Sequence, residues 1–149
     1  AFEYFEWRGN QCGGAAAESL RESGFSGRRL ALKQAMTAIR SYEYEMSRAL
    51  LVAIASVPGT RIYGITDSKS LDQRVPTVSF TLEGKHPRAV AEALGKAGLY
   101  VGDGNYYALA VTERLGVEAN GGMVRVGAAH YNTLEEVARL QETLVKIAK

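Results

Sequence analysis

The feature that most constrains this chain is one long helical pattern, which extends from Arg28 to Val57. Its stripe of side chains recurs at spacings of three and four residues, as along one face of an α-helix. The positions are Leu32, Met36, Ile39, Tyr42 (or Glu43), Met46, Leu50, Ala53 and Val57. Ser26 is a suitable N-cap, and Pro58 ends the helix because the residue before a proline is disfavoured in the helical conformation. Such a helix spans about 45 Å, roughly the width of a compact domain of this size, so we expect it to run beyond its own domain.

After this helix the hydrophobic period changes to two, which is the period of a half-buried β-strand. The pattern predicts strands over 61–65, 77–82, 99–101 and 123–128, and helices that begin at Pro87, run over 106–115 and begin again at Leu134. Polar loops or turns are expected over 66–74, 102–105 and 118–122. Thr133 and Glu136 form a capping box for the last helix. Because regular β–α–β alternation is lacking, we predict an α+β fold of two layers. A small, mostly antiparallel sheet carries helices on one face and is preceded by the long interdomain helix.

The residues before this helix have a different character. Residues 2–8 are predicted to form a short helix that stops at Gly9-Asn10, and 9–27 form a Gly-, Ala- and Ser-rich linker with a short helix over 15–21. Because the chain begins inside an amphipathic pattern, we interpret 1–27 as the end of a large domain followed by a linker. Residues 28–149 are then a separate domain, with the long helix over 28–57 and an α/β core over 60–149.

Composition excludes several classes of protein. Hydrophobic residues make up 46% of the 149 and charged residues 23%, as in average soluble globular domains. No stretch approaches the roughly 20 apolar residues that a membrane helix needs, and a net charge of +2 gives no reason to expect nucleic acid as a partner. The single cysteine, Cys12, cannot form an internal disulfide, so we expect a cytoplasmic location.

The sequence contains no metal-site spacing, phosphate-binding glycine loop or nucleophile elbow. One candidate site is the stretch from Gly102 to Tyr107. Its plain interpretation is a strand-to-helix turn in which Asp103 or Asn105 caps the helix. The alternative is a ligand-binding loop, since glycines let the backbone approach a ligand while Asn105 and Tyr106 offer donors and a stacking surface.

The second candidate is Arg125, which lies in the middle of an apolar strand. An unpaired buried charge costs several kcal/mol, so three interpretations are open. Arg125 forms an internal ion pair, points outward from an edge strand, or holds a carboxylate with two parallel hydrogen bonds. His130 and Asn132 are expected to shape the start of the last helix rather than to carry chemistry.

The order and spacing of several segments resemble a known family over roughly residues 28–149. The segments are Arg74–Phe80, His86–Arg88 followed by a helix, Gly98–Val101, Asp103–Ala108, Gly122–Gly127 and His130–Val137. This succession resembles the C-terminal small domain of class V aminotransferases, and among them the cysteine desulfurase-like proteins. These are fold-type I enzymes that use pyridoxal 5′-phosphate (PLP).

The resemblance implies that Arg125 pairs with the α-carboxylate of an amino-acid substrate, and that Asp103, Asn105 and Tyr106 lie in a loop that approaches the substrate. It also implies a PLP-dependent transferase or lyase, the missing large domain as a partner, and a homodimer. Cysteine desulfurases carry a sulfur-accepting cysteine in this region, and this chain has none there. The family's Schiff-base lysine follows a small-polar and His pattern that none of the six lysines matches. We therefore expect no catalytic residue in this chain, and no activity from it alone.

Two alternatives belong to other classes of protein. The first is a stand-alone module that binds a carboxylate or an amino acid through Arg125. The second is a structural interaction domain that packs one face of the long helix on a partner chain. That face would consist of Met36, Ile39, Met46 and Leu50.

Overall fold

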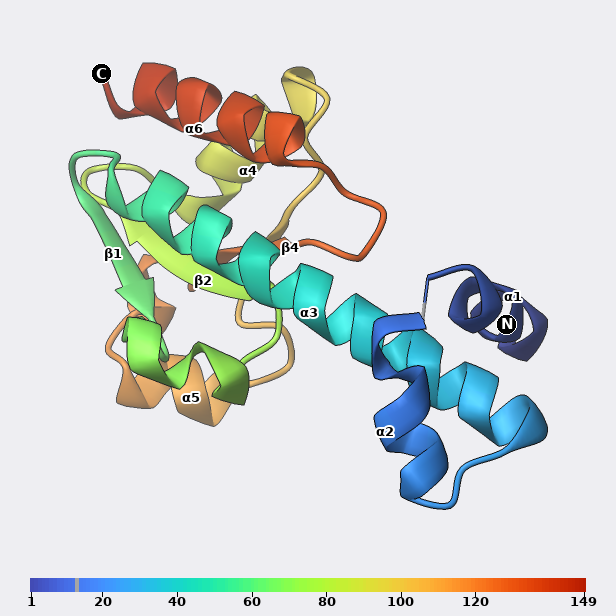
Figure 1. Ribbon diagram of the computed structural model, residues 1–149. Coiled ribbons are helices and arrows are strands. Elements are labelled where there is room, and N and C mark those ends of the chain that lie inside the picture. The colour runs from blue at the N-terminus through green and yellow to red at the C-terminus, as the bar shows by residue number, and fades with distance from the viewer. Residues whose placement is uncertain (13) are drawn as a thin grey trace. The chain divides into compact units, whose positions relative to one another are not determined.

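The computed structural model describes residues 1–12 and 14–149, which form two compact units, Ala1–Glu43 and Tyr44–Lys149 (Figure 1). The long helix α3, Gly27–Ala55, contributes residues to both units. Within the described ranges, no helix is long and apolar enough to cross a membrane.

The first unit contains α1 (Phe2–Cys12), a 3₁₀ turn (Gly14–Ala16), α2 (Ala17–Glu22) and the first part of α3. The predicted stop at Gly9 is wrong, because α1 continues through it. Gly9 is instead a close approach, since a β-carbon at Gly9 would lie 1.8 Å from the carbonyl oxygen of Ala31. Arg28 Nε also pairs with Glu6 Oε2 at 3.0 Å. The glycine therefore serves helix packing rather than helix termination.

The prediction of one long helix is confirmed within two residues at each end. Its apolar stripe is confirmed at Ile39, Met46 and Leu50, which are buried. It is wrong at Met36 and Tyr42, which are 52% and 40% exposed. Ala35 is fully buried in place of Met36, because the inward face of the helix passes through the neighbouring position. A partner-binding face made of Met36, Ile39, Met46 and Leu50 is therefore not available as a set.

The second unit is built on a four-stranded antiparallel sheet with the order β1-β2-β4-β3. The strands are β1 (Thr60–Tyr63), β2 (Thr77–Leu82), β3 (Gly102–Gly104) and β4 (Met123–Gly127). Alternate residues of β2 and β4 point to one face and are buried there. They are Val78, Phe80, Leu82, Val124 and Val126.

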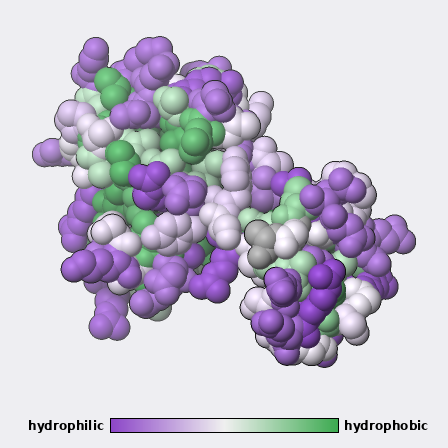
Figure 2. Space-filling view, viewed as in Figure 1, coloured by the Kyte–Doolittle hydropathy of each residue, from purple (hydrophilic) through white to green (hydrophobic). Residues whose placement is uncertain are grey.

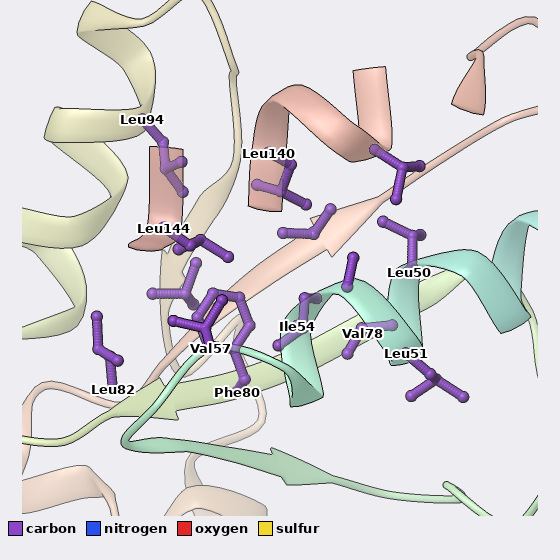
Figure 3. Close-up of a cluster of buried hydrophobic side chains, with 14 of the residues drawn as sticks. Leu50, Leu51, Ile54, Val57, Val78, Phe80, Leu82, Leu94, Leu140 and Leu144 are labelled. Atoms are coloured by element: carbon purple, nitrogen blue, oxygen red, sulfur yellow. The ribbon is translucent and has the colours of Figure 1, made fainter. Parts of the chain in front are cut away.

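Three helices cover this inner face: the end of α3, α4 (Pro87–Lys96) and α6 (Leu134–Ala148). Figure 3 shows their side chains meeting those of the strands, with Ile54, Leu94 and Leu144 around Phe80. Figure 2 shows hydrophobic surface between α3 and α6 of this unit, where a groove of about 230 Å³ is lined by Leu50 and Leu140 among others. The predicted α+β fold, with a small antiparallel sheet and helices on one face, is confirmed.

Two boundaries differ from expectation. The strand predicted over 99–101 is wrong, because the strand is β3, in the segment expected to be a turn. The helix predicted from residue 106 is α5 (Leu109–Arg114), because Tyr106 and Tyr107 have φ of 55° and 62°, outside the right-handed helical region.

The remaining segments follow the sequence more closely. A 3₁₀ helix, Ser68–Gln73, occupies the predicted polar loop, and another, Glu118–Asn120, occupies the predicted turn. The capping box of α6 is confirmed, because Thr133 and Glu136 exchange hydrogen bonds through their side chains and backbone amides. Asn132 organises the same turn, since it accepts from Ala129 N at 2.8 Å and donates to Glu136 at 3.0 Å.

Candidate functional site

Arg125 lies in the middle of β4, and the strand pleat decides where its side chain points. Its neighbours Val124 and Val126 are buried on the inner face, so Arg125 projects from the opposite face and is exposed. Because β4 lies between β2 and β3, it is not an edge strand. The expected internal ion pair is absent among the described residues, where no hydrogen bond or ion pair engages the guanidinium. Of the three interpretations, burial is wrong and an outward orientation is correct.

We call this opposite face the outer face and define it by one row across all four strands. Tyr63 of β1 is paired with Ser79 of β2, Ser79 with Arg125 of β4, and Arg125 with Gly102 of β3. Side chains at paired positions point to the same side of a sheet. Arg125 is therefore flanked by a small hydroxyl on one strand and by a residue without a side chain on the other.

Tyr106 lies over Arg125. The Arg125 Cζ is 4.3 Å from the centroid of the Tyr106 ring, which is a cation–π arrangement. The Tyr106 hydroxyl donates to the carbonyl oxygen of Met123, two residues before Arg125 on the same strand. Burial raises the pKa of Tyr106 to about 12; nearby Arg125 opposes this rise and Asp103 adds to it. The hydroxyl therefore stays protonated and remains a donor at neutral pH.

Gly102 makes room for this pair and was not recognised as a site residue from the sequence. A β-carbon at Gly102 would lie 3.4 Å from Tyr106 Cε1 and 3.9 Å from Arg125 Nε. A side chain larger than a methyl group would therefore meet the ring. The signal for it was present in the glycines of 102–104, but the sequence alone does not show which glycine faces the arginine.

The other two predicted substrate-binding residues have structural partners instead. Asp103 is paired with buried Val124, so it points to the inner face, where its carboxylate lies 3.2 Å from Arg88 Nε of α4. Asn105 donates to Glu118 at 3.1 Å and accepts from the amide of Tyr107 at 3.2 Å. The structure thus brings Arg125 and Tyr106 together but gives Asp103 and Asn105 the work of holding the loop.

Arg74 is a second arginine that the sequence reading did not single out. Its guanidinium donates to the backbone carbonyls of Ile65, Val75 and Thr77 and so closes the loop between β1 and β2. Burial lowers its pKa. Unlike Arg125, this guanidinium is occupied by internal acceptors.

The groups that could carry covalent or metal chemistry lie apart from one another. Cys12, the only cysteine, is exposed at the end of α1 in the first unit. Across residues 1–12 and 14–149, no three His, Cys, Asp or Glu side chains gather as metal ligands would. All six lysines are exposed; they are Lys33, Lys69, Lys85, Lys96, Lys146 and Lys149.

Comparison with known proteins places this arrangement in a family. A family model described as aminotransferase class-V matches residues 26–140. A cysteine desulfurase of Synechococcus elongatus is 32% identical over 115 residues, which are 77% of this chain and 17% of that protein. An aminotransferase-like protein of Gibberella zeae is 34% identical over 111 residues, which are 72% of this chain and 27% of that protein.

Solved structures show the same fold. The apo cysteine desulfurase of Thermococcus onnurineus matches 81% of this chain and 30% of its own, with a TM-score of 0.68 and 24% identity. The cysteine desulfurase CsdA of Escherichia coli matches 82% of this chain and 31% of its own, with a TM-score of 0.62 and 20% identity. This chain therefore spans less than a third of each of these four proteins. Since the family model covers most of the chain, the chain belongs to the class V aminotransferase family, among its cysteine desulfurase-like members.

Proposed function

We propose that this chain is the C-terminal small domain of a PLP-dependent enzyme that acts on an amino acid, and that Arg125 binds the α-carboxylate of the substrate. The observation that carries the proposal is the state of Arg125. Its guanidinium is exposed on the outer face, lies against Tyr106 and makes no hydrogen bond or ion pair with the described residues. Such a planar fork presents parallel N–H donors that match the two oxygens of a carboxylate.

The cofactor of this family does not find a complete site in the residues of this chain. PLP supplies an electron sink for amino-acid chemistry when it is bound. A lysine that anchors it needs a desolvated position that favours the neutral amine, and all six lysines here are exposed. We therefore propose that the rest of the enzyme holds the cofactor. This chain contributes the carboxylate-binding arginine and the loop from Asp103 to Tyr107, which shapes the pocket and excludes water.

The reaction itself follows from what the loop carries. Residues 102–107 contain no cysteine, and the exposed Cys12 lies in the other unit. We therefore propose a transferase or lyase reaction on an amino acid that does not pass sulfur through a cysteine of this loop. A cytoplasmic, homodimeric enzyme stays a prediction, which light scattering on the purified protein checks for the oligomeric state.

The test is the substitution Arg125→Gln in the enzyme that carries this chain. A charged hydrogen-bonded contact contributes about 1.5–3 kcal/mol, so we expect KM for the amino acid to rise roughly 10- to 100-fold. The visible absorbance of the bound cofactor is expected to stay unchanged, because Arg125 binds the substrate and not the cofactor. Steady-state kinetics on the loaded enzyme gives both quantities.

Arg61→Gln is the matched control. Arg61 also projects from the outer face, is exposed, and lies 5.1 Å from the ring centroid of Tyr63. We expect its KM to match that of the unmodified enzyme. An Arg125→Gln enzyme that keeps its KM would overturn the proposal. Saturable binding of amino acids by the isolated chain at full affinity would instead favour a stand-alone carboxylate-binding module.

A further inference from the structure

We propose that Tyr106 is a positioning residue for Arg125: its ring covers one face of the guanidinium and sets the direction of the outward N–H groups. This inference rests on the proposed function, because it assigns Tyr106 a part in the same carboxylate site. It concerns a residue that would not itself touch the substrate.

The contact between the two side chains is the first observation. The guanidinium carbon lies 4.3 Å from the ring centroid, well inside the roughly 6 Å within which a cation and an aromatic face attract each other. An exposed arginine without such a contact samples many rotamers, and binding a ligand then requires that freedom to be lost. With one face of the guanidinium against a ring, its edges remain open to a planar carboxylate.

Tyr106 is itself fixed, and it is fixed to the strand that carries Arg125. Its hydroxyl donates to the carbonyl of Met123 on β4, while its backbone has φ of 55°, a conformation that non-glycine residues rarely adopt. Backbone strain of this kind persists only where surrounding contacts impose it. The ring is therefore referenced at its far end to the same strand as the guanidinium, so the two move together.

The loop supplies those surrounding contacts from both sides. Asn105, the preceding residue, is bonded to Glu118, and Thr112 is bonded to the other oxygen of the same carboxylate. Asp103 joins the start of the loop to Arg88 on α4. These bonds explain why two of the predicted substrate-binding residues have internal partners: they hold Tyr106 in place.

Gly102 is the third observation. It faces Arg125 across the β3–β4 ladder, and its missing side chain leaves the space that the Tyr106 ring occupies. Because no positive φ is recorded for Gly102, a larger residue meets no backbone strain there, and only the contact with the ring opposes it. Gly102→Val therefore displaces the ring without removing the tyrosine.

The experiment compares Tyr106→Leu with Tyr106→Phe in the enzyme that carries this chain. Leucine removes the aromatic face, so we expect KM for the amino acid to rise about threefold to tenfold while kcat stays unchanged. Phenylalanine keeps the ring and loses only its tether to Met123, so KM should lie between that of the leucine variant and that of the unmodified enzyme. Tyr100→Leu is the control, because Tyr100 is exposed and precedes β3.

A spectroscopic readout separates positioning from activity. A proton held over an aromatic face is shielded, so the Arg125 Nε–H signal, assigned through its loss in Arg125→Gln, should appear at unusually high field. Tyr106→Leu and Gly102→Val should each remove that shift, and Tyr106→Phe should keep it. Gly102→Val and Tyr106→Leu should also be non-additive in KM, because both remove the same contact.

The outcomes distinguish this inference from the proposed function. If Arg125→Gln leaves KM unchanged, the proposed function fails. If Arg125→Gln raises KM but Tyr106→Leu and Gly102→Val do not, the positioning role of Tyr106 is wrong and the proposed function stands. An unmodified enzyme without a shielded Arg125 signal overturns the positioning role in the same way.

Discussion

At residue 125 the pleat of β4 allows a charged side chain to sit in the middle of an apolar strand. The alternation Val124-Arg125-Val126 sends the two valines to the core and the arginine to the outer face. That alternation is visible in the sequence, so the exposure of Arg125 was predictable in principle. The contact with Tyr106 was not, because it depends on two tyrosines with positive φ and on a glycine in the neighbouring strand.

Tyr106 leads to a prediction about pH at the same scale. Burial, the largest cause, raises its pKa from 10.0 to about 12. In the unfolded chain the phenol ionises near its ordinary value, so between about pH 10 and 12 the folded state binds more protons than the unfolded one. The stability that the neutral phenol contributes is full below pH 10 and should be lost as the pH rises through 12.

The measurement is denaturant unfolding across this alkaline range for the unmodified protein and for Tyr106→Phe. The difference in unfolding free energy between the two should shrink as the pH rises from 10 to 12. Absorbance titration of the tyrosines should show one fewer late-ionising group in the variant. A constant difference across this range contradicts the raised pKa.

At the scale of elements, the helices were easier to predict than the β3 strand. Periodicity places α3 and α6 because each buries one continuous stripe, and proline and the capping box mark their ends. Periodicity failed at β3, since Gly102–Gly104 has no apolar alternation to read. Leu99 and Val101, predicted as the strand, are partly buried against the core without belonging to it. A strand made of Gly-Asp-Gly exists because of the β4 backbone beside it.

The junction of β3 and β4 therefore depends on Gly122, and this is a testable consequence. Gly122 has φ of 80°, and a β-carbon there would lie 2.3 Å from the carbonyl oxygen of Gly104. Gly122→Ala should lower the free energy of unfolding by more than about 3 kcal/mol, because it combines left-handed strain with a backbone clash. Chemical denaturation measures the change.

Gly84→Ala is the matched control for this substitution. Gly84 also has a positive φ, 69°, but a β-carbon there meets nothing within 4 Å. Its cost should be the left-handed strain alone, roughly 1–2 kcal/mol. Equal losses for the two variants would show that close approach at Gly122 does not determine the β3–β4 pairing.

At the scale of the whole molecule, the chain combines a complete fold with an incomplete active site. The second unit has its own sheet, helical layer and buried core. In contrast, the chain spans less than a third of the lengths of the relatives described above, and its lysines are all exposed. The long helix could be predicted because it is one uninterrupted pattern. The division of the chain within that helix, between Glu43 and Tyr44, has no mark in the sequence.

This combination predicts that the isolated chain does not retain or use the cofactor. An exposed lysine amine is mostly protonated at neutral pH and forms an imine with PLP no better than free lysine does. After incubation with PLP, borohydride reduction and peptide mass mapping, we expect no one of the six lysines to be labelled in preference to the others. Turnover of amino acids should equal that of PLP alone. One lysine labelled stoichiometrically, with turnover above the free-cofactor rate, would mean that the chain builds a complete site by itself.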